Sequence, residues 1–353
     1  MNREIISTLT ARRRDLSVDL LKAVAIFGVI IIHTCSYSYD IASFNWTSSV
    51  FWGSAVRASV PLFFMCSGAL LLRPEIELPM KKLFTKNILR IIVAMLIWAM
   101  AYKIFHLLAA HSLSLASLLQ AFKEVLLFNQ EFHFYFLHII LLVYLFLPVT
   151  RIITKYAEKS QLEYLLALWF ALGILFPSVI SYWPFKLLSS IPLQYKLNMT
   201  YSAIGYGLLG YYIKRYPLKK RSWYAISLAI GFIITFGGTC VFSLVKGTFD
   251  TQFLEGMSVG VCLMAAGIFG LCVSSRDVEN EKLRRVIVYL SKASFCVFLT
   301  HVFFVYALSA LGIAATILPS IVSTPLIACI ILLGSVLIYM VLSRIPIIKD
   351  WII

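Results

Sequence analysis

The sequence has few charged residues. Asp, Glu, Lys and Arg together make up 13% of its 353 residues, where a soluble domain usually has about 25%. Hydrophobic residues account for 61%, and the mean hydropathy is +0.89. Such a chain has too little polar surface to cover a water-soluble globule. We therefore expect an all-α, polytopic membrane protein whose helices face lipid or pack between lipid-facing helices.

Several sequence motifs are also missing. No glycine-rich nucleotide loop and no long polar loop interrupts the apolar runs, which excludes a pump that carries its own nucleotide-binding domain. The seven cysteines lie in or beside apolar runs without a C-x-x-C pair, so we interpret them as packing residues and expect no metal site. The excess of 31 basic over 16 acidic residues is spread between apolar runs. It predicts membrane topology and no nucleic-acid partner.

Apolar runs of the length needed to cross a bilayer recur along the chain. We expect about ten transmembrane helices, at residues 17–37, 50–72, 88–109, 133–150, 162–180, 199–213, 223–245, 253–273, 286–311 and 323–343. The amphipathic stretch 112–128 is expected to lie along the interface. Of the 31 Lys and Arg, 23 fall in alternate connecting segments and the two tails, and four fall in the other loops. This asymmetry predicts that both termini are cytoplasmic. We expect a single domain spanning residues 1–353, of which residues 1–16 form a basic cytoplasmic tail.

Ionisable side chains inside an apolar run are costly, so each is a candidate functional residue. Lys22 and His33 are eleven residues apart in the first run. That spacing is close to three helical turns, so both project from one face, about 16 Å apart along the axis. In one interpretation Lys22 extends to the interface and His33 makes a single interhelical hydrogen bond. In the other, a ligand has its anionic end at Lys22 and its reactive end at His33. Coenzyme A has that shape.

The spacing Lys22-x10-His33 matches the (Arg/Lys)-x10-His signature of the acyltransferase-3 family of integral membrane acyltransferases. Other stretches resemble elements of the same family in the same order, with Phe134 and Tyr135 shifting one aromatic pattern. They are DLLKAVAI at 19–26, VPLFFMCSG at 60–68, a basic stretch with Arg90, FHFYFL at 132–137, GLLGYY at 207–212 and SFCVFLTH at 294–301. Within the family, the chain resembles most in type the stand-alone enzymes that O-acetylate enterobacterial polysaccharides such as lipopolysaccharide, capsule and enterobacterial common antigen.

The resemblance implies transfer of an acetyl group from cytoplasmic acetyl-CoA to a hydroxyl of a cell-surface polysaccharide or its lipid-linked precursor. The reaction would take place at the bacterial inner membrane, with the saccharide acceptor at the periplasmic face and membrane lipid around the enzyme. His33 is the expected general base, because imidazole titrates near neutral pH. A covalent acyl-histidine is the alternative role.

The other candidate residues follow from the resemblance or from their depth in a span. Lys22 and Arg90 are expected to contact coenzyme A phosphates, and Ser67 to line the pantetheine path. The simpler alternatives are an interfacial lysine, a positive-inside charge and a small residue at a helix contact. His133, Arg57 and His301 are expected to bind the acceptor, and Arg57 alternatively to pair with Asp40.

Two other functions remain open. A transporter or flippase for a lipid-linked saccharide would also have many spans and buried cations, but proton- or sodium-coupled carriers usually need membrane-embedded carboxylates, which are nearly absent here. The second open function is the same acyl transfer with a succinyl donor. Apart from these two functions, the plainest alternative is a purely structural membrane scaffold.

Overall fold

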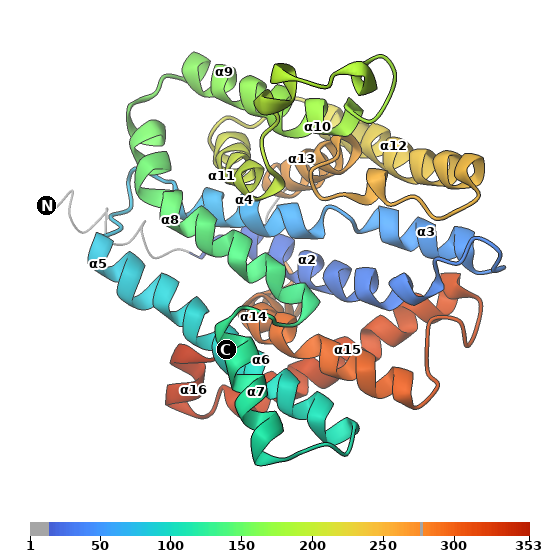
Figure 1. Ribbon diagram of the computed structural model, residues 1–353. Coiled ribbons are helices and arrows are strands. Elements are labelled where there is room, and N and C mark those ends of the chain that lie inside the picture. Colours follow the sequence, from blue (N-terminus) through green and yellow to red (C-terminus); the bar gives the residue numbers. More distant parts are fainter. Residues whose placement is uncertain (1–13, 276–277) are drawn as a thin grey trace, which may run out of the picture.

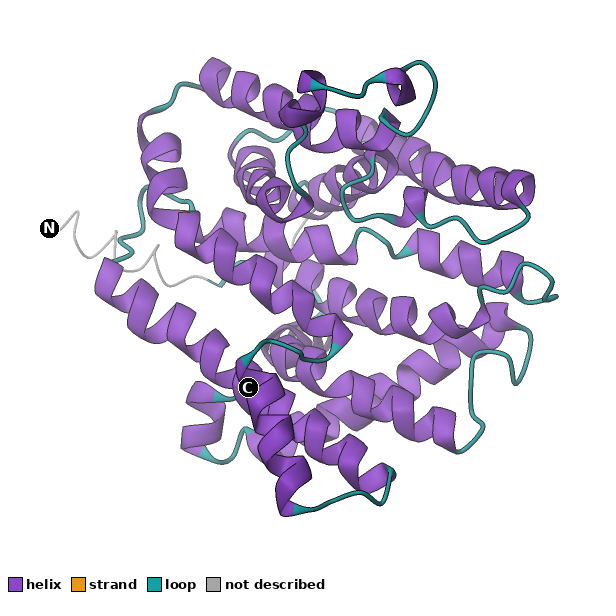
Figure 2. Cartoon of the chain, in the orientation of Figure 1, coloured by secondary structure: helices purple, strands orange, loops and turns teal. Residues whose placement is uncertain are grey.

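The computed structural model describes residues 14–275 and 278–353, and within these residues it contains helices and loops but no strand (Figure 2). Of the expected basic tail, residues 1–13 lie outside the described part. The first half of the chain contains α2 (Leu16–Cys35), η1 (Ser36–Ser38), α3 (Trp46–Ala55), α4 (Ser59–Leu71), α5 (Met80–Lys82), η2 (Leu83–Ile88), α6 (Leu89–Ala109), α7 (Leu115–Leu126), η3 (Phe132–Phe134), α8 (Tyr135–Tyr156) and α9 (Lys159–Phe170). The second half contains η4 (Ala171–Leu175), α10 (Phe176–Val179), η5 (Phe185–Leu187), η6 (Ile191–Tyr195), α11 (Met199–Arg215), α12 (Ser222–Lys246), η7 (Gln252–Leu254), α13 (Val259–Val273), α14 (Glu281–Ala310), α15 (Ser320–Leu342) and α16 (Pro346–Trp351).

Nine helical segments of the described chain are long and apolar enough to cross a membrane, which confirms the all-α, polytopic architecture. The sequence predicted ten membrane-crossing helices, and the predicted helix that is not among the nine is the run 199–213. It forms α11, which at 17 residues is shorter than each of the nine. At about 1.5 Å per residue it extends roughly 25 Å, the lower limit for a crossing. The sidedness of the termini stays a prediction.

Helix α2 lies in the centre of the helical bundle. It packs against α3, α4, α13, α14 and α15, and Figure 1 shows it between α4 and α14. Its side chains Leu21, Ala25 and Ile30 are fully buried. Asp15 caps its first turn, because the carboxylate accepts a hydrogen bond from the backbone N–H of Val18. The position of α2 brings the residues it carries next to both the amino- and carboxyl-terminal halves of the chain.

Glycines set the distance between α4 and α11. A Cβ at Gly68 would stand 1.8 Å from the carbonyl oxygen of Gly207, and one at Gly210 would stand 2.2 Å from that of Met65. Only residues without a side chain allow two helix backbones to approach this closely. The contact fixes Ser67, the neighbour of Gly68, relative to the rest of the bundle.

The amphipathic stretch forms α7, which is not among the nine long apolar segments. A capping box between Ser114 and Ser117 begins the helix. Ala121 and Val125 are buried on the side that packs against α6, whereas Leu115 and Leu119 are exposed. The exposed leucines fit the expected position along the interface, which stays a prediction.

Candidate active site

A cavity of about 460 Å³ opens between α2, α4, α6, α8 and α14. It brings together three predicted site residues, Lys22, Ser67 and Arg90, from three different helices. None of the described residues that line it is acidic. The complete lining is Lys22, Phe63, Ser67, Lys86, Asn87, Arg90, Ile91, Phe136, Leu137, Ile140, Tyr144, Ser291, Lys292, Ser294, Phe295 and Phe298.

Two cations of this cavity, Lys86 and Lys292, were not among the predicted site residues. Lys86 lies in a basic connecting stretch and looks like an ordinary positive-inside charge. Lys292 lies inside an apolar run, and the cost of a cation there was the signal that could have found it. Four positive side chains therefore surround one cavity, an arrangement that suits a ligand with several negative charges.

The three predicted residues are held differently. Arg90 donates a hydrogen bond to the backbone carbonyl of Ile353 and lies over the ring of Phe295, while its Nε is buried without a partner. The Ser67 hydroxyl donates to the carbonyl of Phe63 in its own helix, over 3.0 Å. Lys22 forms no ion pair with any described residue. Lys22 is thus the most available of the three for an anionic ligand.

Three histidines from distant parts of the chain form a cluster. His33 of α2, His133 of η3 and His301 of α14 have ring centroids 5.2 Å (His33–His301), 5.3 Å (His133–His301) and 6.4 Å (His33–His133) apart. His133 and His301 are 1% and 0% exposed, and His33 is half-buried. Phe132, more than half exposed, lies 5.2 Å from the His33 ring. We call His33, His133 and His301 the histidine cluster.

Several nitrogens of the histidine cluster are buried without a hydrogen-bond partner. His301 Nδ1 is 2.7 Å from the carbonyl oxygen of Phe298 and 3.2 Å from that of Val297, whereas its Nε2 has no partner. Neither ring nitrogen of His133 has one. Buried polar atoms in proteins are nearly always hydrogen-bonded. Unpartnered nitrogens at one point are therefore available to a polar ligand group.

One of two paired phenylalanines on the cavity wall also contacts the histidine cluster. Phe136 and Phe298 both line the cavity, and their ring centroids are 5.1 Å apart. Phe298 also lies 5.5 Å from the ring of His133 and 6.0 Å from that of His301. The side of the cavity that Phe298 forms is therefore next to the histidine cluster.

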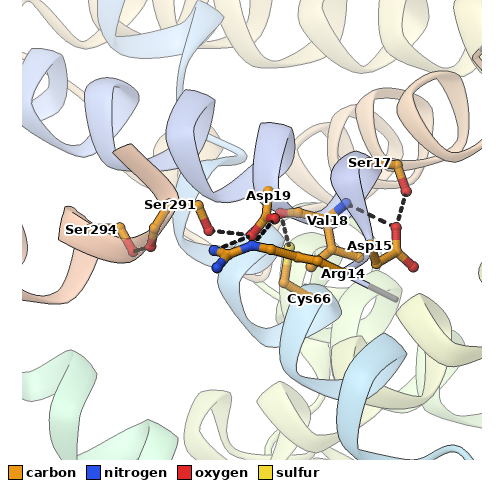
Figure 3. A network of polar contacts seen from close by, with 8 residues as sticks. All are labelled: Arg14, Asp15, Ser17, Val18, Asp19, Cys66, Ser291 and Ser294. Atoms are coloured by element: carbon orange, nitrogen blue, oxygen red, sulfur yellow. Dashed lines mark hydrogen bonds and ion pairs between the residues drawn. The ribbon is translucent and has the colours of Figure 1, made fainter. Parts of the chain in front are cut away.

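A buried carboxylate supports one wall of the cavity (Figure 3). Asp19 pairs with Arg14 and accepts a hydrogen bond of 2.6 Å from the Ser291 hydroxyl, and Ser294 donates to the Ser291 carbonyl over 2.9 Å. Both serines line the cavity. From the sequence alone, Asp19 had no role beyond its place in a motif, because its partner Ser291 lies at the other end of the chain.

The predicted pair between Arg57 and Asp40 is wrong. Arg57 donates to the backbone carbonyl of Leu254, and Asp40 instead accepts from the backbone N–H of Ala42 in its own turn. Arg57 lies in the turn between α3 and α4 and is half-buried. Acceptor binding by Arg57 stays a prediction.

A family model for an acyltransferase domain, that of the acyltransferase-3 family, matches residues 15–344. The chain belongs to this family. The match includes α2, the four cavity cations and all three members of the histidine cluster. Searches of curated proteins and of solved structures found no significant match. This membrane acyltransferase therefore has a defined reaction class, and its donor and acceptor must be argued from the site.

Proposed function

We propose that this acyltransferase moves an acetyl group from cytoplasmic acetyl-CoA to a hydroxyl of a cell-surface polysaccharide, or its lipid-linked precursor, at the periplasmic face of the inner membrane. The observation that carries the proposal is the cavity lined by Lys22, Lys86, Arg90 and Lys292, whose wall residue Phe298 also lies 5.5 Å from the ring of His133 in the histidine cluster. Coenzyme A joins several phosphate charges to a thioester by a long, thin arm, and the cavity offers cations together with aromatic and hydroxyl groups.

The chemistry assigned to the site is general-base acyl transfer. His33 removes the proton from the acceptor hydroxyl as the oxygen attacks the thioester carbonyl carbon. The C–O bond forms, the C–S bond breaks, and the sulfur leaves with the proton that His33 returns. Lys22 and Arg90 hold donor phosphates through charge-assisted hydrogen bonds. Exposed Phe132 beside His33, together with Arg57 and His133, forms the acceptor side.

The function can be tested in membrane vesicles that contain the protein. Radiolabelled acetyl-CoA is supplied at the cytoplasmic side, and label is measured in separated lipopolysaccharide, capsule and enterobacterial-common-antigen fractions. We expect label in one fraction, and the saccharide of a deletion strain should lose the same group. Label in none of the fractions, with an unchanged saccharide in the deletion strain, would contradict the proposal.

The alternatives give different results in the same system. A flippase would move a lipid-linked saccharide without consuming acetyl-CoA. A succinyl donor would add the mass of succinate to the saccharide, which mass spectrometry separates from an acetyl group. An acyl-histidine intermediate would leave label on the protein when acceptor is withheld, whereas a general base would leave none.

A further inference from the structure

We propose that His301 is a positioning residue for His33: its Nε2 accepts a hydrogen bond from a ring N–H of His33 and stabilises the imidazolium that forms during transfer. This inference rests on the proposed function, in which His33 is the base. It assigns His301 a role different from the acceptor binding predicted from the sequence.

The tautomer of His301 follows from its backbone contacts. Nδ1 lies 2.7 Å from the carbonyl oxygen of Phe298 and 3.2 Å from that of Val297. A carbonyl oxygen only accepts, so Nδ1 carries the hydrogen. A neutral imidazole has a single N–H, and Nε2 therefore presents a lone pair. The backbone of α14 fixes this tautomer of His301, because both carbonyls lie in the preceding turn of the helix.

The position of that lone pair suits His33. His301 is 0% exposed and its Nε2 is buried without a partner. The ring centroids of His33 and His301 lie 5.2 Å apart with an interplanar angle of 36°, so the two imidazoles are direct neighbours that are not yet hydrogen-bonded. Catalytic hydrogen bonds are often long in the free enzyme and shorten when substrate binds. A carboxylate often orients a catalytic histidine, but burying one in a membrane is costly, and a neutral imidazole acceptor avoids that cost.

The proton inventory balances with this assignment. One nitrogen of His33 takes the hydroxyl proton while its other N–H points to His301 Nε2. The new C–O bond replaces the C–S bond, and His33 then gives the proton to the departing sulfur. His301 neither gains nor loses a proton overall. His133 cannot take the same role by this argument, because neither of its nitrogens is fixed by a backbone contact.

Two substitutions separate this role from a structural one. Asparagine can place an amide N–H near Nδ1, preserving the contact to the Phe298 carbonyl, whereas glutamine can place an amide oxygen near Nε2. If His301 orients His33, His301→Gln should retain activity within about tenfold of wild type. His301→Asn should lose about 100-fold in kcat, the scale of a disabled general base, with the KM for acetyl-CoA unchanged. If His301 only holds the helix, the order reverses.

The outcomes are distinguishable. An active wild-type enzyme in which His301→Asn outperforms His301→Gln, or in which both variants match wild type, overturns the role of His301 and leaves the proposed function intact. A wild-type protein that transfers no acetyl group overturns both. Size-exclusion profiles and melting temperatures in detergent establish that each variant is folded.

A measurement on the wild-type protein covers the case in which the variants do not fold. His301 is the only histidine that follows a threonine, so labelling threonine with carbonyl ¹³C and histidine fully with ¹³C and ¹⁵N selects its backbone amide by NMR, and transfer through the histidine carbons then reaches its ring nitrogens. We expect the nitrogen shift of Nε2 to be that of an unprotonated imidazole nitrogen. A protonated Nε2 in the resting enzyme would overturn the assignment.

Discussion

Gly68 of α4 and Gly207 of α11 lie against each other in an asymmetric way. A Cβ added at Gly68 would stand 1.8 Å from the Gly207 carbonyl oxygen, whereas one added at Gly207 would meet its nearest atom, the Phe64 carbonyl oxygen, at 3.8 Å. The first distance is impossible without moving a helix and the second is an ordinary contact. The two glycines of this contact therefore differ in whether they tolerate an added side chain.

We expect Gly68→Ala to destabilise the protein and to reduce activity. The new methyl group must push α4 away from α11, which costs about 1–3 kcal/mol for overpacking, and displaces Ser67 at the cavity wall. Melting temperature in detergent and acetyl transfer measure the two effects. Gly207→Ala is the matched control and should stay within about 0.5 kcal/mol of wild type. Equal tolerance at both positions would show that the helices are not in contact here.

We expect His33→Ala to lose at least about 100-fold in acetyl transfer, because it removes the proposed general base. The protein should still be present in the membrane at normal level. His138→Ala is the control, since His138 packs against Phe128 outside the histidine cluster. A His33→Ala enzyme that modifies polysaccharide at the wild-type rate would refute the role of His33.

We expect Lys22→Ala and Lys292→Ala to raise the KM for acetyl-CoA, each by roughly tenfold, as expected for the loss of a hydrogen bond to a charged group. Because the attraction is electrostatic, the wild-type KM should also rise with salt. Lys123→Ala is the control, since Lys123 is exposed on α7 and does not line the cavity. An unchanged KM in both cavity variants would show that the donor phosphates do not bind in this cavity.

We expect the pair between Asp15 and Lys214 (2.9 Å) to stabilise the protein at neutral pH and not in acid. Burial favours a higher pKa for Asp15, but hydrogen bonds from Lys214 and Ser17 and the charge of Lys214 hold the pKa below its ordinary value. The stabilisation is therefore present above the ordinary pKa and is lost as pH falls through the pKa of the folded protein.

Asp15→Asn tests this, because asparagine caps a helix as well as aspartate does and removes only the charge. Its melting temperature should lie below that of wild type at neutral pH, and the difference should vanish on acidification. Lys214→Met should give the same convergence. A difference that is independent of pH would assign the effect to packing and not to charge.

Local sequence patterns predicted much of this structure, because an apolar run of suitable length decides helix formation without reference to its neighbours. The run 88–109 corresponds to α6 (Leu89–Ala109), and the run 286–311 overlaps α14 (Glu281–Ala310) up to its last residue. The short run 199–213 was harder to classify, because α11 depends on glycine contacts with α4 that no local pattern records.

The site was less predictable for the same reason. Helical spacing put Lys22 and His33 on one helix face, and their roles stay predictions. The proximity of His301 to His33, the support of Ser291 by Asp19 and the carbonyl contact of Arg57 all join segments far apart in the chain. A single sequence contains no signal for such pairs.

The contact between Phe136 and Phe298 has a consequence for the cell. A protein that admits a donor from one side of the membrane and a sugar from the other would let ions leak across the membrane if a continuous column of water ever joined its two entrances. Two apolar rings whose centroids lie 5.1 Å apart offer water no polar partner on this wall of the cavity. On the proposed route, hydrated ions are therefore opposed at this point, and the narrow tail of the donor must itself displace the rings to reach the histidine cluster.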